Sequence, residues 1–368
     1  MNIGHIISTG GFYGAEKVIL ELAQHQTSIG QNVTLGVLPS PGADKLIEEA
    51  NRVNVKSEIL QYNNDNLFSQ IKSIKLFVKK YKLNVIHSHS YKTNILLGVS
   101  RIRGCLKLTT CHTWYSDNFK LKLYEYLDKI LIKIFFDHIV VVSPQLKIEL
   151  LNFKVNENKI SMIENGLSII FHDTESCRDK YRKIWGLSED QLLMVRVGRL
   201  AYDKGNDVLL KALKELKHLN IVLVFLGEGP EYESLVKLTK QFNLSENVKF
   251  LGFRDDVAEI LYASDVFVSP SFKEGLPMVL LEAMAAKICI VSTDVGAISD
   301  LLTSDVNSIL IKPKQIIPLS EAIEKVASDK KLRINLGQSA YDLYKSNYSR
   351  ESMGARYNIL YEKLLEKY

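Results

Sequence analysis

Cysteine, proline and glycine are all scarce in this chain. Its 368 residues include 4 Cys, 8 Pro and 20 Gly, which excludes collagen-like, low-complexity and disulfide-rich proteins. The cysteines form no C-x-x-C pair, so we expect neither a zinc site nor a disulfide framework. Free thiols are typical of a reducing compartment. We therefore expect a cytoplasmic protein, with the inner face of the cell membrane as the alternative location.

Long apolar runs and a strong charge of one sign are also missing. No apolar stretch approaches the roughly 20 residues that span a bilayer, and the first residues do not resemble a secretion signal. The net charge of +5 comes from lysines spread along the chain. We therefore expect anionic small molecules or a membrane surface as partners, and no nucleic acid.

Short apolar runs that alternate with amphipathic stretches are what the chain does contain. This rhythm predicts βαβ units and parallel sheets. It occurs twice, so we predict two doubly wound, Rossmann-like α/β domains: residues 1–170, a linker at 171–190, residues 191–348, and a C-terminal helix at 349–368 that crosses back to the first domain or docks on the second. The expected strands are Ile3–Ser8, Val33–Leu38, Val85–Ser88, Leu106–Thr110, Ile139–Val142, Leu192–Val197, Ile221–Leu226, Val248–Leu251, Val266–Val268, Ile288–Ser292 and Ser308–Ile311.

Two loops of the second domain carry glycines where strands end. The segment GRLAYDKG contains Gly198, Arg199 and Lys204, and GEGPEYESL contains Gly227 and Gly229. Two cations five residues apart can converge on one anion such as a diphosphate, and glycines allow close backbone approach. Solvated basic residues and ordinary strand-to-helix turns are the alternative interpretation. The sequence offers no reason for Arg196, which interrupts an apolar strand.

The segment EGLPMVLLE places two carboxylates around the expected start of a helix. Pro277 is expected as its first residue, so the amides near Met278 would face an anion. Glu274 precedes this helix and Glu282 lies inside it. The pair could bind hydroxyl groups at two ends of one ligand. The alternative is an acid favoured by the helix dipole and an exposed glutamate. Lys287, and no glycine, follows the helix, so we expect no left-handed cap there.

In this order and spacing, the three segments resemble the retaining nucleotide-sugar glycosyltransferases of family 4, which have the two-domain GT-B fold with a cleft between the domains. The segments GGFYGAEKVILELA, VIHSHS, TTCHTW and KISMIENGL extend the resemblance over essentially the whole chain. The resemblance implies that Arg199 and Lys204 hold the donor diphosphate and stabilise the leaving group. It implies that Glu282 binds the ribose and that Glu274 contacts the donor sugar near the reacting carbon.

The resemblance implies further contacts to the donor. Backbone amides of Gly275, Leu276, Pro277 and Met278 would lie along its sugar and phosphate. Gly11 or Gly14 would approach the diphosphate from the first domain, and His112 would approach the sugar from the acceptor side. Gly198, Gly227 and Gly229 are expected to line the donor loops.

The resemblance and the loop chemistry together predict a metal-independent, retaining transfer of a sugar to a glycan or lipid-linked acceptor in surface polysaccharide or glycoconjugate synthesis. No D-x-D segment occurs in the chain, and two fixed cations can stabilise the departing diphosphate without a metal. We expect no cofactor. As donor substrate, a UDP-sugar is favoured over a GDP-sugar. A nucleotide-sugar epimerase and a catalytically silent donor-binding subunit are the alternatives.

Two other features have open interpretations. His87 and His89 point to one side of a strand end and could bind a metal, but a hydrogen-bonded core histidine is the preferred interpretation because no third ligand accompanies them at suitable spacing. The segment Phe119–Phe136 combines lysines with a broad apolar face. It could lie on a membrane, or it could be an ordinary packed helix.

Overall fold

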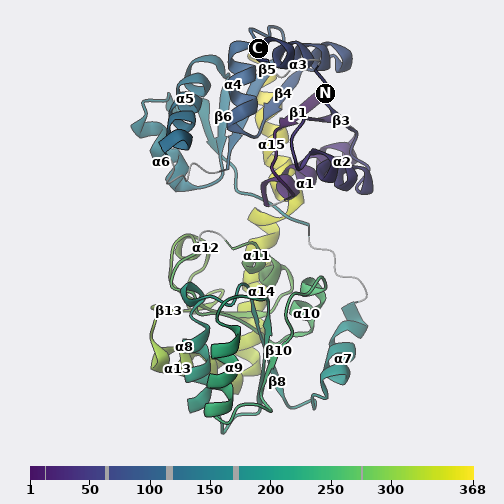
Figure 1. Ribbon diagram of the computed structural model, residues 1–368. Coiled ribbons are helices and arrows are strands. Elements are labelled where there is room, and N and C mark those ends of the chain that lie inside the picture. The colour runs from purple at the N-terminus through teal and green to yellow at the C-terminus, as the bar shows by residue number, and fades with distance from the viewer. Residues whose placement is uncertain (13, 63–65, 113–118, 169–173, 275–276) are drawn as a thin grey trace. The chain divides into compact units, whose positions relative to one another are not determined.

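The computed structural model describes residues 1–12, 14–62, 66–112, 119–168, 174–274 and 277–368. The chain forms two compact units (Figure 1). The first unit consists of Met1–Ser168 and Asn347–Tyr368, and the second of Ile169–Ser346. Each unit is an α/β domain around one parallel sheet, which confirms the predicted fold class.

The sheet of the first unit has seven parallel strands in the order β3-β2-β1-β4-β5-β6-β7. The central strands are buried, as continuous apolar runs in a parallel sheet require. The strands are β1 (Asn2–Ile7), β2 (Asn32–Val37), β3 (Ser57–Ile59), β4 (Val85–Ser88), β5 (Leu106–Cys111), β6 (His138–Val141) and β7 (Ile160–Met162). The short edge strands β3 and β7 were not predicted, since three residues carry too little periodicity.

The helices of the first unit connect these strands in the expected alternation. They are α1 (Gly14–Ser28), α2 (Ala43–Arg52), α3 (Leu67–Tyr81), α4 (Tyr91–Val99), α5 (Phe119–Phe135) and α6 (Pro144–Asn152). Side chains cap several of their N-termini, for example Ser90 on α4 and Ser143 on α6.

The sheet of the second unit has six parallel strands in the order β10-β9-β8-β11-β12-β13. They are β8 (Leu192–Val197), β9 (Ile221–Leu226), β10 (Val248–Phe250), β11 (Val266–Ser269), β12 (Cys289–Thr293) and β13 (Ile309–Ile311). All six agree with the predicted runs to within one residue at each end. The strand order reverses between β8 and β11, where open α/β sheets bind their ligands.

The helices of the second unit include one that was not predicted. They are α7 (Thr174–Trp185), α8 (Asn206–Glu215), α9 (Tyr232–Gln241), α10 (Val257–Ala263), α11 (Met278–Ala285), α12 (Ile298–Leu301), α13 (Ile316–Ser328) and α14 (Lys330–Leu343). The prediction of a linker at 171–190 is wrong for α7, which packs on α10. Tyr181 of α7 is buried and donates a hydrogen bond to Asp256 over 2.5 Å. The charged sequence of α7 gave no sign of this packing.

The C-terminal helix α15 (Arg350–Leu365) belongs to the first unit, the first of its two predicted positions. It lies beside α1, and Arg350 donates a hydrogen bond to Gln24 over 2.7 Å. Its own residues Met353, Tyr357 and Tyr361 are buried. These residues recur at helical spacing, which accounts for one buried face of the helix.

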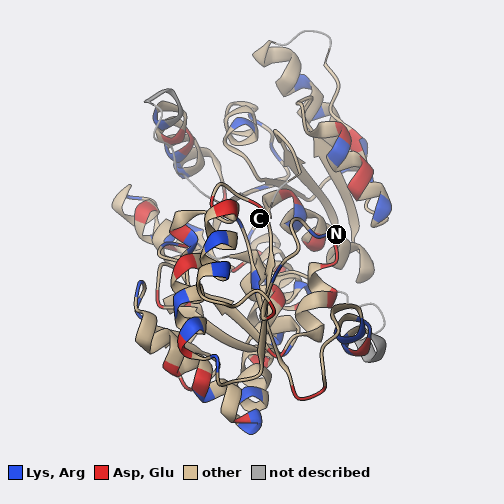
Figure 2. Cartoon of the chain, turned by 60° about the horizontal axis from the view of Figure 1, so that its bottom comes forward, with Lys and Arg blue, Asp and Glu red and all other residues tan. Residues whose placement is uncertain are grey.

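The charged residues of both signs are spread over the structure (Figure 2), and the cysteines lie in its interior. Basic and acidic positions are interspersed along the helices (Figure 2). All four cysteines are buried, and none of them forms a disulfide. Within the described residues, no helix has both the length and the apolar character needed to cross a bilayer.

Candidate active site

The predicted donor residues of the second unit gather where β8, β9 and β11 end. Parallel strands bring their carboxyl ends to one edge, so the loops after them are neighbours. Backbone hydrogen bonds join these loops: the amide of Leu200 donates to Glu228, and that of Phe272 donates to Asp203. Segments that are far apart in the sequence therefore form one rim.

Lys204 and Glu274 form an ion pair at this rim. Nζ of Lys204 lies 2.8 Å from Oε1 of Glu274, and Ser271 donates to the same oxygen over 2.7 Å. Both side chains are mostly enclosed, with exposures of 19% and 12%. The structure thus brings together a cation and a carboxylate that are 70 residues apart.

Arg199 lies on the outer side of this pair. Its side chain is 66% exposed, and Asp203 links it to Lys204 through contacts of 3.6 and 3.7 Å. An exposed pair of this kind contributes little to stability. The guanidinium can therefore turn towards a ligand at small cost.

Arg196 explains how Glu274 is held, which the sequence did not reveal. It is buried, with 2% exposure, and donates to Asn206 over 3.2 Å and to Ser271 over 3.4 Å. Ser271 in turn donates a hydrogen bond to Glu274. Burial lowers the pKa of Arg196 to about 10, and Glu274 partly offsets this. Arg196 is thus a charged support beneath the carboxylate.

The glycines of the rim allow its loops to pack backbone against backbone. Gly227 has φ 133°, and a Cβ there would lie 2.3 Å from the carbonyl oxygen of Gly198. A Cβ on Gly229 would meet the carbonyl oxygen of Leu200 at 2.3 Å. Gly296, which was not predicted, has φ 55° and would place a Cβ 2.0 Å from the carbonyl oxygen of Glu274. These glycines therefore fix the shape of the site.

A cavity of about 370 Å³ opens between the loops after β8 and β9. Gly198, Arg199 and Gly227 line it, together with Phe253 and Arg254. The side chain of Phe253 is 75% exposed. Phe253 was not predicted for the site; in the sequence it stands in the segment LGFRDDV, directly after β10.

The helix after Glu274 begins one residue later than predicted. Pro277 is the N-cap and Met278 the first residue of α11. Glu282 lies one turn inside α11 and is partly buried. Lys287 adopts the left-handed conformation, with φ 58°, so the expectation that no left-handed cap follows α11 is wrong. Gly275 and Leu276 lie outside the described residues.

The predicted residues of the first unit also follow strand ends. Gly11 lies after β1, and its backbone packs on that of Gly42. A Cβ on Gly42 would lie 2.3 Å from the backbone nitrogen of Gly11. Gly14 begins α1 and has open space around it. His112 follows β5, and burial lowers its pKa to about 4.

Comparison with known proteins agrees with this architecture. The family profile described as Glycosyltransferase Family 4 matches residues 12–169, and the one described as Glycosyl transferases group 1 matches residues 177–343. An uncharacterized glycosyltransferase of Methanocaldococcus jannaschii is 31% identical over 306 residues, 77% of each chain. The chain belongs to the family 4 glycosyltransferases.

Other glycosyltransferases resemble it over similar lengths. The UDP-Gal:alpha-D-GlcNAc-diphosphoundecaprenol alpha-1,3-galactosyltransferase of Escherichia coli is 30% identical over 287 residues, 74% of each chain. The crystal structure of Anabaena Alr3699/HepE in complex with UDP has a TM-score of 0.81 at 17% identity and covers 99% of this chain and all of that one. The two units together thus constitute the GT-B fold.

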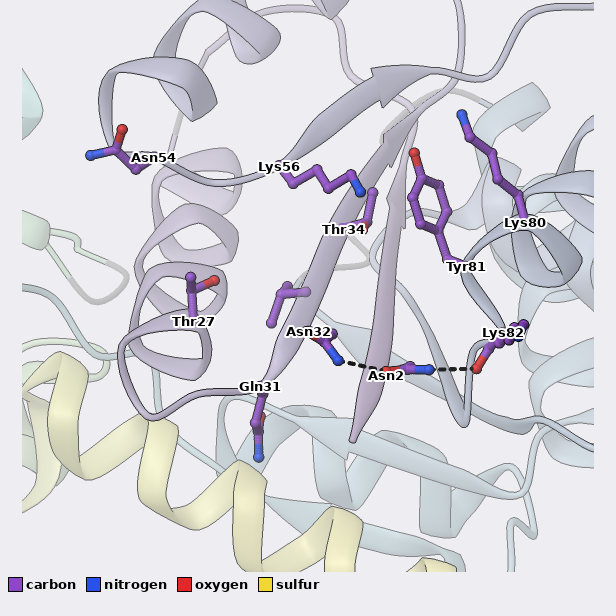
Figure 3. Close-up of a pocket in the computed structure, with 11 residues that line it drawn as sticks. Asn2, Thr27, Gln31, Asn32, Thr34, Asn54, Lys56, Lys80, Tyr81 and Lys82 are labelled. Carbon is purple, nitrogen blue, oxygen red and sulfur yellow. Dashed lines mark hydrogen bonds between the residues drawn. The ribbon is translucent and has the colours of Figure 1, made fainter.

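The first unit of this glycosyltransferase has a further cavity of about 420 Å³, at the amino ends of β1 and β2 (Figure 3). Asn2, Asn32, Lys56, Tyr81 and Lys82 are among its lining residues. It opens at the edge of the sheet opposite His112. No residue predicted for the site lines it, so we assign it no part in the reaction.

Proposed function

We propose that this glycosyltransferase transfers a sugar, with retention of configuration and without a metal, from a nucleoside-diphosphate sugar to a glycan or lipid-linked acceptor. The observation that carries the proposal is the ion pair of Lys204 and Glu274 beside Arg199 at the carboxyl ends of β8 and β11. It offers two cations for a diphosphate and one carboxylate for a sugar.

The proposed step breaks the bond between the anomeric carbon and the oxygen of the departing phosphate. The acceptor hydroxyl oxygen bonds to that carbon on the same face of the sugar, and its proton goes to the departing phosphate oxygen. Arg199 and Lys204 stabilise the charge that develops on the diphosphate. No side chain is required as a nucleophile or a base.

The carboxylates have separate proposed tasks. Glu274, held by Ser271 and through it by Arg196, binds a sugar hydroxyl near the reacting carbon. Glu282 binds the ribose, and the free amides at the start of α11 meet the phosphate. His112 of the first unit contacts the sugar.

A UDP-sugar is the donor that we propose. The cavity beside Arg199 and Phe253 has room for a nucleoside and offers an aromatic side chain for a base. Solved structures of Anabaena Alr3699/HepE hold UDP and UDP-glucose. The Escherichia coli galactosyltransferase is named for UDP-Gal and a diphosphoundecaprenol acceptor.

An acceptor attached to a lipid, in polysaccharide or glycoconjugate synthesis, would suit the surface of α5. Its Leu123, Tyr126 and Ile134 are all more than half exposed, and Lys122 could meet anionic headgroups. We propose that α5 contacts the membrane. Replacing Leu123 and Tyr126 with Ser should reduce co-sedimentation with vesicles of anionic lipid about tenfold. Unchanged sedimentation, with Phe68→Ser on α3 as the matched control, would exclude this contact.

The experiment for the main proposal is a thermal shift with UDP, GDP and ADP, followed by a panel of donors scored for released nucleoside diphosphate. We expect UDP to give the largest shift and a UDP-sugar to react in buffer with EDTA. A UDP shift without turnover on any donor and acceptor would favour a silent donor-binding subunit. Interconversion of the nucleotide sugar without release of diphosphate would instead indicate an epimerase.

A further inference from the structure

Four histidines of the first unit project from one face of its sheet. His5 of β1 is paired in register with His87 of β4, and His87 with Leu108 of β5. Side chains alternate along a strand, so His89 lies on the same face as His87, and His112 on the same face as Leu108. His5 and His87 have no exposed surface, and His89 has 6%.

One hydrogen-bonded chain runs from α1 to His89. Nε2 of His5 lies 2.8 Å from Oε1 of Gln26, and Nδ1 of His5 lies 3.0 Å from Nε2 of His89. With the Gln26 carbonyl as acceptor, Nε2 of His5 carries the proton, so its Nδ1 accepts from Nε2 of His89. This direction fixes the tautomers of both rings. Nδ1 of His89 is then a buried acceptor without a partner among the described residues.

A second chain joins the cluster to α15. The hydroxyl of Tyr361 lies 2.6 Å from Nδ1 of His87, whose Nε2 lies 2.8 Å from Oγ1 of Thr110. Thr110 in turn lies 2.8 Å from the hydroxyl of Tyr357. The centre of the His89 ring lies 4.2 Å from that of His87 and 5.8 Å from that of His112.

The side chain of His112 makes no hydrogen bond to the described residues. Both of its ring nitrogens are buried and unpartnered. The groups that face the cluster are the histidines themselves, Gln26 and Thr110, with Tyr357 and Tyr361 on α15. Burial raises the pKa of both tyrosines, so they stay neutral. Arg356, near Tyr357, is paired with Glu164. Within the described part of the chain, no carboxylate compensates a positive charge on the cluster.

We infer that His89, fixed by His5 and Gln26, is a positioning residue that holds the neutral ring of His112 in place for the donor sugar, and that His87 ties this support to α15. The inference rests on the role proposed above for His112. A ring whose buried nitrogens have no partner among the described residues keeps both for a ligand, but it then needs neighbouring rings to fix its plane. His89 supplies that contact.

A metal is the other use of such a cluster. One nitrogen from each of His5, His87 and His89 lies within 4.8 Å of the other two, whereas nitrogens of a tetrahedral zinc site are about 3.4 Å apart. The nitrogens that face each other already share a hydrogen bond, and both nitrogens of His87 have side-chain partners. The hydrogen-bonded cluster therefore accounts for the contacts better.

The test compares His89→Leu with His89→Gln, which keeps an amide donor for Nδ1 of His5. We expect His89→Leu to lower kcat about tenfold or more with the donor KM within about twofold. The acid limb of its pH profile should move up from near 4 towards the ordinary value of about 6.5, because water reaches His112. His89→Gln should restore kcat to within about threefold of the natural protein. His138→Gln, a buried histidine of β6 bonded to Ser161, should change neither kcat nor the profile.

Different outcomes separate failure of the proposed role of His112 from failure of the inference about His89. Natural kcat in His112→Ala would remove the role of His112 and the inference with it. An inactive His112→Ala beside a His89→Leu with natural kcat and pH profile would overturn the inference alone. If His89→Leu does not fold, Gln26→Leu should lower kcat about threefold at unchanged donor KM, and natural kcat there would overturn it too. Stabilisation by stoichiometric Zn²⁺ that His5→Gln abolishes would show a metal site and also overturn it.

Discussion

Lys204 donates to Oε1 of Glu274 over 2.8 Å, and both side chains are mostly enclosed at the rim of the second sheet. The charge of Lys204 is therefore already paired with that of Glu274. In the proposed function, a diphosphate competes with Glu274 for Lys204, and the displaced carboxylate is then available to a sugar hydroxyl. One contact thus links binding of the phosphate to binding of the sugar.

The support beneath Glu274 should be measurable by replacing Arg196 with Leu. Ser271 and Asn206 then lose their buried donor, which should cost about 2 kcal/mol of stability and lower kcat about tenfold because Glu274 is misplaced. UDP affinity should change less than about threefold, since Lys204 and Arg199 remain. Arg333→Leu is the control, because Arg333 donates to backbone carbonyls of the same unit away from Glu274. Equal loss of kcat in both variants would refute the role of Arg196.

The end of α11 provides a stability prediction. Lys287 has φ 58°, and its Nζ lies 4.2 Å from the centre of the Tyr341 ring. Lys287→Gly and Lys287→Ala both lose that contact, but only glycine relieves the left-handed backbone. We expect the glycine variant to be more stable than the alanine variant by about 1 kcal/mol. Urea unfolding of the two proteins measures this difference, and equal midpoints would show that the backbone is not strained.

Acid should destabilise the first unit. Burial lowers the pKa of His5 and His112 to about 4, and those of His87 and His89 well below the ordinary value. Below about pH 6.5 these histidines bind protons in the unfolded chain but stay neutral in the folded unit. Stability is thus complete above that value and falls towards pH 4, by about 1.4 kcal/mol per pH unit for each histidine.

Hydrogen exchange followed separately in the two units at about pH 7 and pH 5 tests this pH dependence. We expect the protection of β1, β4 and β5 to fall far more than that of β8 and β9. His218→Gln, an exposed position of the second unit, should leave the difference unchanged. Equal loss of protection in both units would contradict the account.

The sequence predicted the sheets well because buried parallel strands are continuous apolar runs, as in Leu192–Val197 and Ile221–Leu226. It did not predict α7, whose charged residues conceal one apolar face. Motif spacing placed Lys204 and Glu274 near one rim, but their direct contact depends on how the loops fold. Arg196 could not be interpreted from the sequence, since its partners Asn206 and Ser271 come from two other segments. Phe253 stands in the segment LGFRDDV, but it was not among the residues predicted for the site.

Calorimetric titration of UDP, paired with the transfer rate, tests the central claim in Lys204→Ala and Glu274→Gln. We expect Lys204→Ala to weaken UDP binding about tenfold or more and to lower turnover about 10²-fold, because a charge on the diphosphate loses its partner. Glu274→Gln should bind UDP about threefold more tightly, since Lys204 is released, yet transfer sugar at least about 10²-fold more slowly. Lys211→Ala, whose partner is Asp207, should resemble the natural protein. Natural UDP affinity and turnover in Lys204→Ala would contradict the account.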